Sequence, residues 1–372
     1  MPPPAYSPSV AICIPTFNQA DYLRLAVRSA ATQSYAGVCE IWVGDDASSD
    51  HTEAVLDELT REFEGLRVVR REKNVGIAVN SSSLLAMPRT DLLVRLDSDD
   101  ELEPEFLVRL IELMGGAPSA GYGHSAITEI DEHGNRRRER RLARGTGHQD
   151  AEAALRASLS GHRAAANIVM FRRSALEELN FYSFETEYVE DYDLSVRMAD
   201  AGYGNVYVDE LLGRYRVWSD AAGVRARRKA MQLSGYTRMF EHTFPRAWER
   251  RGWSTRALRR RRERLARHHC ASCFGAQNTA QEQQELVGLL RRLGDSRGLR
   301  LRIMLCRLGF AALLMRVDKL PAHVKRVVKF AIRVVRDRPR RGLSGPRRGV
   351  SAGSRAQEIT DDDYRARQRS MA

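Results

Sequence analysis

The sequence lacks the marks of a secreted or membrane-spanning protein. Its 372 residues include only five cysteines, an odd number scattered along the chain, whereas secreted disulfide proteins carry even and dense cysteine frameworks. The N-terminus, Met1-Pro2-Pro3-Pro4, has neither the basic segment nor the apolar segment of a signal peptide. No run approaches the ~18 apolar residues that a spanning helix needs. We therefore expect a cytoplasmic protein, at most peripheral on the inner face of the membrane.

Two common phosphate-binding signatures are also missing. There is no Gly-Lys-Ser/Thr sequence of a P-loop, and the pairs Gly121/Gly123 and Gly202/Gly204 lack the third glycine of a dinucleotide fingerprint. Nicotinamide chemistry is therefore disfavoured. With 43% apolar and 29% charged residues, the composition is that of an ordinary globular protein and excludes collagens and low-complexity polymers.

The net charge of +12 is distributed unevenly along the chain. Residues 1–220 carry 23 basic and 36 acidic side chains, whereas residues 221–372 carry 37 basic and 12 acidic ones. A basic protein usually suggests a phosphate-rich partner, but here the basic character belongs to the C-terminal part alone. We expect one domain over residues 1–220, a helical basic region over 221–336 and a disordered tail over 337–372.

Short apolar runs alternate with amphipathic stretches in the first 120 residues. We expect strands at Val10–Ile14, Glu40–Val43, Leu66–Val69 and Leu92–Leu96, and helices at Asp21–Ala31, Glu53–Phe63, Ala78–Met87 and Glu105–Met114. The alternation predicts an α/β protein with a mainly parallel sheet and helices on both faces. A further strand is expected at Ile168–Phe171. Ligands of such sheets bind beyond the carboxyl ends of the strands, where chemistry should be sought.

Polar and acidic residues follow three of these strands. They are Pro15-Thr16-Phe17-Asn18, Gly44-Asp45-Asp46-Ala47-Ser48-Ser49-Asp50 and Asp97-Ser98-Asp99-Asp100. One such turn is commonly a helix N-cap, but two acidic turns at one sheet edge repel each other unless a cation compensates. Asp97 and Asp99 suit Mn²⁺ or Mg²⁺, which binds one or two carboxylates together with phosphate oxygens. The pattern predicts a divalent cation whose other ligand is a diphosphate.

A third acidic cluster, Glu190-Asp191-Tyr192-Asp193, opens a helical pattern over Leu194–Ala201. Acidic residues in a first helical turn complement the helix dipole, which is one interpretation of the cluster. The other is that the chain brings the cluster opposite the cation, where it would supply a carboxylate base. Both interpretations stay open at this point.

In order and spacing, these motifs resemble those of the family 2 glycosyltransferases, nucleotide-diphospho-sugar transferases with the GT-A fold. The resemblance covers residues 9 to about 220 and rests on Ile14–Asn18, Asp45–Asp50, Asn74-Val75-Gly76, Asp97–Asp100, Phe171-Arg172-Arg173, and Glu190–Leu194 with Arg197 and Gly202. It implies a Rossmann-like, mainly parallel sheet, here followed by a C-terminal helical basic extension. It also implies an inverting transfer of a sugar, most simply from a UDP-sugar, to a hydroxyl of a glycan or lipid-linked glycan in cell-surface polysaccharide synthesis.

The resemblance implies roles for individual residues. The donor pocket is expected at Pro15, Thr16, Phe17, Asn18, Asp46, Asn74, Gly76, Asp97 and Ser98, with Asp46 accepting a hydrogen bond from the base. Asp97 and Asp99 correspond to the ends of the family's DXD motif, and Asp99 is the expected direct metal ligand. Asp191 corresponds to the catalytic base and Glu190 to its supporting neighbour. Asp191 would take the acceptor's proton while the cation stabilises the departing diphosphate.

Two positions depart from the family's pattern. Val79 stands where the family often has an arginine, before the asparagine that corresponds to Asn80, which removes one usual phosphate or base contact. Trp218, within Arg214–Ser219, stands where many members have a histidine, and an indole cannot bind a metal. Arg216 is expected either to neutralise the diphosphate or to be a surface arginine without a role.

The basic region contains a segment, residues 321–336, whose apolar and basic side chains separate onto opposite faces of a helix. Such a helix suits an anionic membrane surface, although a helix packed on the protein with a solvated basic face has the same pattern. The nearly continuous apolar stretch Ile303–Met315 suits either a core helix or the membrane interface. A nucleic-acid partner is not expected, because the aromatic residues here are not interleaved with the arginine clusters.

Other functions stay open as alternatives. A sugar nucleotidyltransferase shares the alternating sheet but is expected to have a glycine-rich basic loop after its first strand, which Pro15–Asn18 is not. A non-catalytic sugar-nucleotide-binding protein with a nucleic-acid-binding tail is the second alternative. Cys270-x-x-Cys273 is a weak zinc or redox pattern, because no second pair accompanies it. The oligomeric state does not follow from these patterns.

Overall fold

The structure is a computed structural model that describes residues 7–319 except 163, 165, 184–185, 187, 219–227 and 277. The amphipathic segment 321–336 and the tail 337–372 lie outside the described residues, so the expectations for them stay predictions. The described residues on both sides of the expected boundary at 220 belong to one compact unit, Met1–Lys319.

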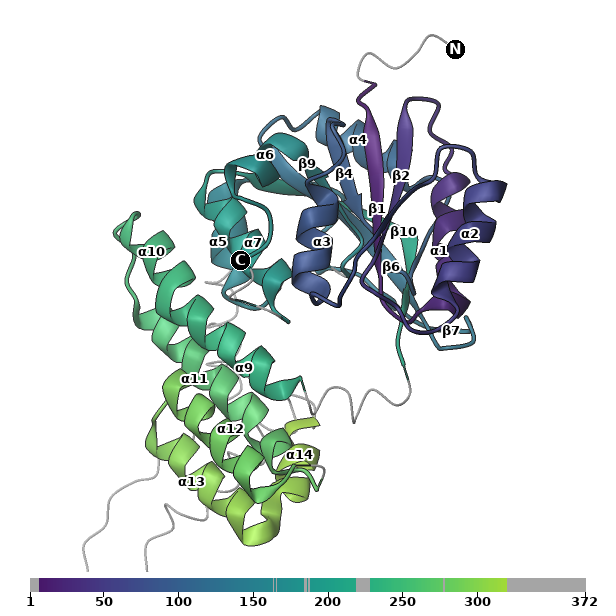
Figure 1. The fold of residues 1–372 in the computed structure, drawn as a ribbon. Helices are drawn as coiled ribbons and strands as arrows, with labels where there is room; N and C mark the ends of the chain where they lie inside the picture. The colour runs from purple at the N-terminus through teal and green to yellow at the C-terminus, as the bar shows by residue number, and fades with distance from the viewer. Residues whose placement is uncertain are drawn as a thin grey trace, which may run out of the picture. The chain divides into compact units, whose positions relative to one another are not determined.

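The N-terminal part alternates strands and helices in the predicted order (Figure 1). It contains β1 (Val10–Thr16), α1 (Ala20–Ala31), β2 (Cys39–Asp45), α2 (Thr52–Glu62), β3 (Arg67–Arg70), α3 (Ile77–Leu85), β4 (Leu92–Arg95), β5 (Glu101–Leu102) and α4 (Phe106–Gly115). Each of the four predicted strands and four predicted helices is present, with ends displaced by a few residues. The alternating apolar runs are therefore confirmed as β-α units.

The second half of the sheet is mixed in direction. It is built from β6 (Ala120–Ile130), β7 (Arg136–Arg140), β8 (Gly147–Gln149), β9 (Val169–Arg172) and β10 (Gly204–Arg216), with the helices α5 (Ala151–Ser158), α6 (Arg173–Glu178) and α7 (Glu190–Asp200) between them. The strand order in the described part is β3-β2-β1-β4-β9-β6-β10-β5. The first four strands are parallel, whereas β9 is antiparallel to both neighbours, β4 and β6. The predicted α/β fold, with a mixed sheet flanked by helices, is confirmed.

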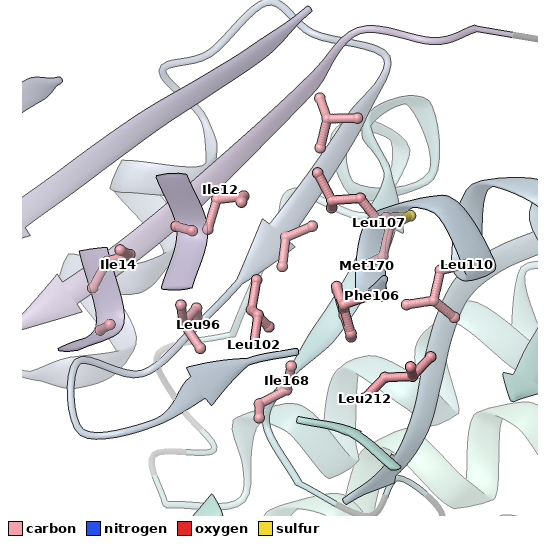
Figure 2. Packing of buried hydrophobic residues seen from close by; sticks show 14 of the residues in the cluster. Ile12, Ile14, Leu96, Leu102, Phe106, Leu107, Leu110, Ile168, Met170 and Leu212 are labelled. Atoms are coloured by element: carbon pink, nitrogen blue, oxygen red, sulfur yellow. The ribbon is translucent and has the colours of Figure 1, made fainter. Parts of the chain in front are cut away.

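Both faces of the sheet are buried under helices, which explains why the strands are apolar at consecutive positions. Ile12 and Ile14 (Figure 2) point to the face covered by α1, α2 and α4, and Val94 belongs to the same cluster. Ala11, Cys13 and Leu93 point to the opposite face, which α3, α6 and α7 cover. Burial also raises the pKa of the Cys13 thiol, which is therefore an inert part of the core.

The strand register brings the chemically interesting loops to one edge. Thr16 and Asp45, the last residues of β1 and β2, are paired in the register, and the backbone N–H of Asp46 donates to the carbonyl of Thr16 at 3.0 Å. On the other side of β1, Cys13 is paired with Arg95, the last residue of β4. The turns after β1, β2 and β4 therefore leave the sheet as neighbours, as parallel strands require.

The helices after the sheet form a second core. They are α9 (Lys229–Arg238), η2 (Met239–Thr243), α10 (Phe244–Glu249), α11 (Arg256–Cys270), η3 (Ala271–Phe274), α12 (Ala280–Leu293), α13 (Arg297–Leu305), η4 (Cys306–Phe310) and α14 (Ala311–Lys319). Their apolar residues cluster with those of α5 and α7, and the Thr243 hydroxyl donates to Asp193 at 2.6 Å. Cys270 and Cys273 are free, buried members of this core. In the described part of the chain, we find no helix with the length and apolarity required to traverse a membrane.

Candidate functional site

A cleft of about 1190 Å³ opens at the carboxyl ends of the strands. Each residue predicted for the site lines it: Pro15, Thr16, Phe17, Asn18, Asp46, Asn74, Gly76, Asp97, Ser98, Asp99, Glu190, Asp191 and Arg216. These residues come from six separate segments, and only the topology of the sheet brings them together. The volume and the mixed lining are those of a small-molecule site.

The loops after β1 and β2 are tied into one wall of the cleft. Asn18 has a φ of 53°, and its side-chain oxygen accepts the backbone N–H of Ser49 at 2.7 Å. Its own N–H donates to the Ser48 hydroxyl at 2.9 Å. Asparagine tolerates this left-handed conformation and offers a short acceptor, so Asn18 fixes the shape of this wall.

Asp46 connects this wall to the turn that precedes α3. Its two carboxylate oxygens accept the backbone N–H groups of Val75 and Gly76 at 2.8 and 2.9 Å. Gly76 has a φ of 87°, which favours glycine, so the pair Asp46–Gly76 needs these two residue types. Asp46 therefore holds the Asn74–Gly76 turn in place, whatever further hydrogen bond it makes to a ligand.

The acidic turn after β4 is crowded with negative charge. Burial and the nearby Asp97 carboxylate raise the pKa of Asp99. Burial and the charges of Asp99 and Asp97 raise the pKa of Asp100 well above its usual range. The Asp100 Oδ2 atom is buried and has no hydrogen-bond partner among the described residues. The carboxylates of Asp97, Asp99 and Asp100 repel one another, and a cation at Asp99 would relieve the repulsion.

Two residues at the end of β10 hold this turn. The Arg216 guanidinium, 1% exposed, donates to the backbone oxygens of Asp99 and Asp131 at 2.9 Å and pairs with Glu101 at 3.0 Å. The indole N–H of Trp218 donates to the Asp99 carboxylate at 2.8 Å. Arg216 is thus a buried residue that positions the turn and not a surface arginine without a role, whereas its contact with the diphosphate stays a prediction. Trp218 cannot bind a metal itself, but its indole contacts Asp99, the predicted metal ligand.

A buried arginine joins the acidic turn to the start of α7. Arg95, 2% exposed, donates from Nε to Asp97 at 2.9 Å and from Nη1 to Asp191 at 2.8 Å, and lies 3.8 Å from Glu190. The Asn167 amide donates to the other oxygen of Asp97 at 3.4 Å. Both oxygens of Asp97 therefore accept from protein side chains, whereas among the described residues the side-chain hydrogen bond to Asp99 comes from Trp218, on Oδ2. Asp99 is the better placed of the two to receive a cation.

The three acidic residues in the first turn of α7 make different contacts. Asp193 faces away from the cleft, towards Arg197 at 2.7 Å and Thr243. Asp191 contacts Arg95 and lines the cleft. Glu190 is buried, and its Oε2 atom has no hydrogen-bond partner in the described part of the structure. Burial and the charge of Asp191 raise the pKa of Glu190 to about 7. All three lie in the first turn of α7, as the helix-dipole interpretation expects, and Glu190 and Asp191 line the cleft as well.

The contribution of Glu190 to the free energy of unfolding should therefore fall as the pH rises from 5 to 8. Between its usual pKa and about 7, Glu190 binds more protons in the folded than in the unfolded state, so deprotonation favours unfolding. Glu190→Gln should remove a penalty on the order of 1–3 kcal/mol at pH 8 and leave stability at pH 5 nearly unchanged. Urea unfolding at both pH values, in EDTA, measures this. The exposed Glu105→Gln is the control, and an equal pH dependence in both variants would contradict the assignment.

Residues 11–179 match the model of the family described as Glycosyl transferase family 2. This segment is a family 2 glycosyltransferase domain. An N-acetylglucosaminyltransferase of Mesorhizobium japonicum is 29% identical over 55% of this chain and 50% of its own length. The putative teichuronic acid biosynthesis glycosyltransferase TuaG of Bacillus subtilis is 31% identical over 29% of this chain and 43% of its own. The chain thus spans about half the length of these relatives.

Solved structures place the glycosyltransferase domain in the GT-A fold. The mannosyltransferase PcManGT from Pyrobaculum calidifontis, in complex with GDP-Man and Mn²⁺, superposes with a TM-score of 0.52 at 17% identity, covering 86% of this chain and 90% of its own. S. aureus TarS 1-349 in complex with UDP-GlcNAc gives a TM-score of 0.51 at 13% identity, covering 81% of this chain and 92% of its own. At 13–17% identity, similarity to a solved structure concerns the fold alone. It confirms the predicted GT-A fold.

Several residues of this cleft were not predicted from the sequence. Arg95 carries the only signal that was visible, since it interrupts an otherwise apolar strand, Leu92–Leu96, at a buried position. Asn167 and Tyr22 have no such mark. Tyr22 packs edge-on against Trp218 with ring centroids 4.9 Å apart, and the Arg216 guanidinium lies 4.6 Å from its ring. These contacts depend on the position of β10, which the sequence patterns did not predict.

Proposed function

We propose that this chain is an inverting, metal-dependent glycosyltransferase that transfers a sugar from a nucleotide diphosphate, a UDP-sugar, to a hydroxyl of a glycan or lipid-linked glycan in polysaccharide synthesis. The observation that carries the proposal is the cleft in which the Asp99 turn and Asp191 lie at the carboxyl ends of the strands, joined through Arg95. A donor diphosphate at the turn and a base across the cleft are the two requirements of a single displacement.

Asp191 is the proposed base. Its Oδ1 atom accepts from Arg95, and the carboxylate still lines the cleft, so a second lone pair can accept the proton of an acceptor hydroxyl. Arg95 fixes the orientation of the carboxylate, and Glu190 lies beside it without a hydrogen bond of its own on Oε2. The hydroxyl is thereby deprotonated as it attacks the anomeric carbon, and no covalent enzyme intermediate is needed.

The residues present fit a divalent cation that shares its ligands with the donor. In the described chain, no three His, Cys, Asp or Glu side chains are gathered for an ion, so phosphate oxygens of the donor would have to supply further ligands, as Mg²⁺ or Mn²⁺ allows. Asp99 would hold the cation, with Asp97 beside it as the other end of the motif. When bound, the cation offsets the charge that develops on the departing diphosphate.

The class of acceptor is proposed from the relatives. TuaG is named for teichuronic acid biosynthesis, and AmsE of Erwinia amylovora, 28% identical over 43% of this chain and 58% of its own, for amylovoran biosynthesis. Both names refer to polysaccharides. A lipid-linked acceptor would bring the protein to the inner face of the membrane. The membrane contact predicted for residues 321–336 falls outside the described residues and stays a prediction.

A panel of nucleotide sugars tests the proposed function. A ligand that binds only the folded state raises the melting temperature, so UDP-, GDP- and dTDP-sugars are compared with and without Mn²⁺. We expect one donor class to raise the melting temperature, and a larger rise in the presence of Mn²⁺. UDP-sugars are the expected class, and the GDP-Man of PcManGT makes GDP-sugars the necessary comparison. The absence of a shift with every donor would contradict the proposal.

Asp99→Ala should lose the metal-dependent part of donor binding. We expect affinity for UDP in the presence of Mn²⁺ to fall by roughly 10–100-fold, because the protein's own oxygen ligand to the cation is removed. Affinity measured in EDTA should change little. Calorimetry of UDP binding in both conditions gives the comparison, with Asp295→Ala, an exposed carboxylate in the helical region, as the control. Undiminished Mn²⁺-dependent affinity would show that Asp99 is not the ligand.

A further inference from the structure

The last described helices expose an apolar surface that the proposed transferase chemistry does not use. Of the 13 large hydrophobic side chains exposed in the described residues, six lie between positions 301 and 317 and are 41–64% exposed. We call this surface the α13–α14 apolar face; it consists of Leu301, Met304, Leu308, Phe310, Leu313 and Val317. Clusters of this kind are rare on soluble monomers and mark contact sites.

The face lies opposite the side of these helices that packs on the protein. Leu301, Met304 and Leu308 precede a kink at Gly309 and are spaced by three and four residues, which places them on one face of their helix; Phe310, Leu313 and Val317 follow the kink with the same spacing. The core-facing positions between them are filled by Leu299, Ile303, Cys306 and Ala311, which are buried in the second core. The exposed residues are therefore a formed outer surface and not a disrupted part of the core.

Positive charge accompanies the face. Residues 297–319 contain six basic side chains and one acidic side chain, Asp318, which pairs with Arg302. Arg307 and Arg316 are exposed within the face, and no ion pair found among the described residues engages either of them. An occupant of this surface must be apolar and must carry negative charge at its rim.

An anionic bilayer meets both requirements along an extended surface. Leucine, methionine and phenylalanine enter the acyl region, while arginines stay at the headgroups, as in interfacial helices. The chain continues from Lys319 for 53 further residues that are again rich in Arg and Lys. An anionic surface would therefore attract both the helices before Lys319 and the segment after it. A protein partner would have to repeat the acidic and apolar pattern over the same length.

We propose that the α13–α14 apolar face docks on an anionic lipid surface, with Leu308 and Leu313 among the acyl chains and Arg307 and Arg316 at the headgroups. The contact holds the protein at the bilayer without a spanning segment. It is independent of sugar transfer, because none of its residues lines the cleft. Vesicle binding is measured without donor or acceptor, so its failure and the failure of the transferase proposal are separate results.

Sedimentation of the full chain with vesicles tests the proposal. Vesicles of phosphatidylcholine alone and of phosphatidylcholine with phosphatidylglycerol are compared. We expect binding to the anionic vesicles, and Leu308→Asp/Leu313→Asp should weaken it roughly tenfold or more. Val38→Asp/Leu25→Asp adds the same charge at exposed leucine and valine positions elsewhere and should bind like the wild type. Arg307→Gln/Arg316→Gln should lose roughly fivefold per arginine on anionic vesicles and little on neutral ones.

Hydrogen exchange of the full chain distinguishes a lipid surface from the other possible occupants of the face, which are the chain itself and a second copy. Anionic vesicles should slow the exchange of the amides of residues 301–317 beyond the protection that their helical hydrogen bonds already give in the protein alone. Equal affinity of Leu308→Asp/Leu313→Asp and the wild type would overturn the proposal, since the lipid contact would then lie elsewhere. A dimer that the double variant abolishes, or exchange at residues 301–317 that anionic vesicles leave unchanged, would also overturn it, because a second copy or the chain itself would then cover the face.

Discussion

Asp191→Asn is expected to reduce sugar transfer by about 10²–10⁴-fold, the usual contribution of a general base. Asparagine has the same shape, and its carbonyl oxygen can still accept from Arg95, so the cleft should keep its structure. Donor affinity should remain within about twofold of the wild type, because the base acts only in the chemical step. Turnover and donor binding, measured on the same preparation, give both quantities.

Asp193→Asn is the matched control for this experiment. Asp193 lies two residues further along α7 and carries the same side chain, but it faces Arg197 and Thr243 rather than the cleft. Its substitution should lower stability without a comparable loss of turnover. Near-normal turnover in Asp191→Asn, or an equal loss in the two variants, would remove Asp191 from the role of base.

Arg95→Met should destabilise the fold by about 3–5 kcal/mol, because it leaves the carboxylates of Asp97, Asp191 and Glu190 together without their common cation. Methionine fills a similar volume, so the loss reports the charge and not a large cavity. Urea unfolding measures the change. Arg89→Met, on an arginine whose side chain is 84% exposed, should change stability by less than about 0.5 kcal/mol.

A double variant tests whether Arg95 stabilises the fold through its charge. In the Arg95→Met background, Asp191→Asn should restore part of the lost stability, because it removes one of the carboxylates that Arg95 compensates. Additive losses in the double variant would mean that Arg95 acts through packing alone. A stable Arg95→Met protein would show that the three carboxylates do not depend on this arginine.

The N-terminal half of the fold was predictable because its strands are buried on both faces. A buried parallel strand is a continuous apolar run, and β1 and β4 therefore stand out in the sequence. β10 does not, because it carries Asp209, Glu210 and Gly213 and changes register between Val208 and Gly213. Irregular strands lose the period of two on which such predictions rest. Its position in the sheet, and hence the contacts of Arg216 and Trp218, followed only from the structure.

The residues of the site were predicted better than their contacts. Loops after parallel strands must meet at one edge, so the turns at Thr16, Asp46 and Asp97 were expected to be neighbours. The pairing of Asp97 with Asp191 through Arg95 joins positions 94 residues apart, and no local pattern contains that information. Topology decides such contacts, whereas spacing along the chain decides only which side chains are available.

Release of nucleoside diphosphate from a nucleotide sugar is the most direct test of the account. The donor that raises the melting temperature is incubated with the protein and Mn²⁺, first without an acceptor and then with glycan acceptors. The account predicts slow release through hydrolysis, faster release with an acceptor, and loss of both in Asp191→Asn. A donor that binds tightly, yet yields no diphosphate under any of these conditions, would contradict it and identify a sugar-nucleotide-binding protein without transferase activity.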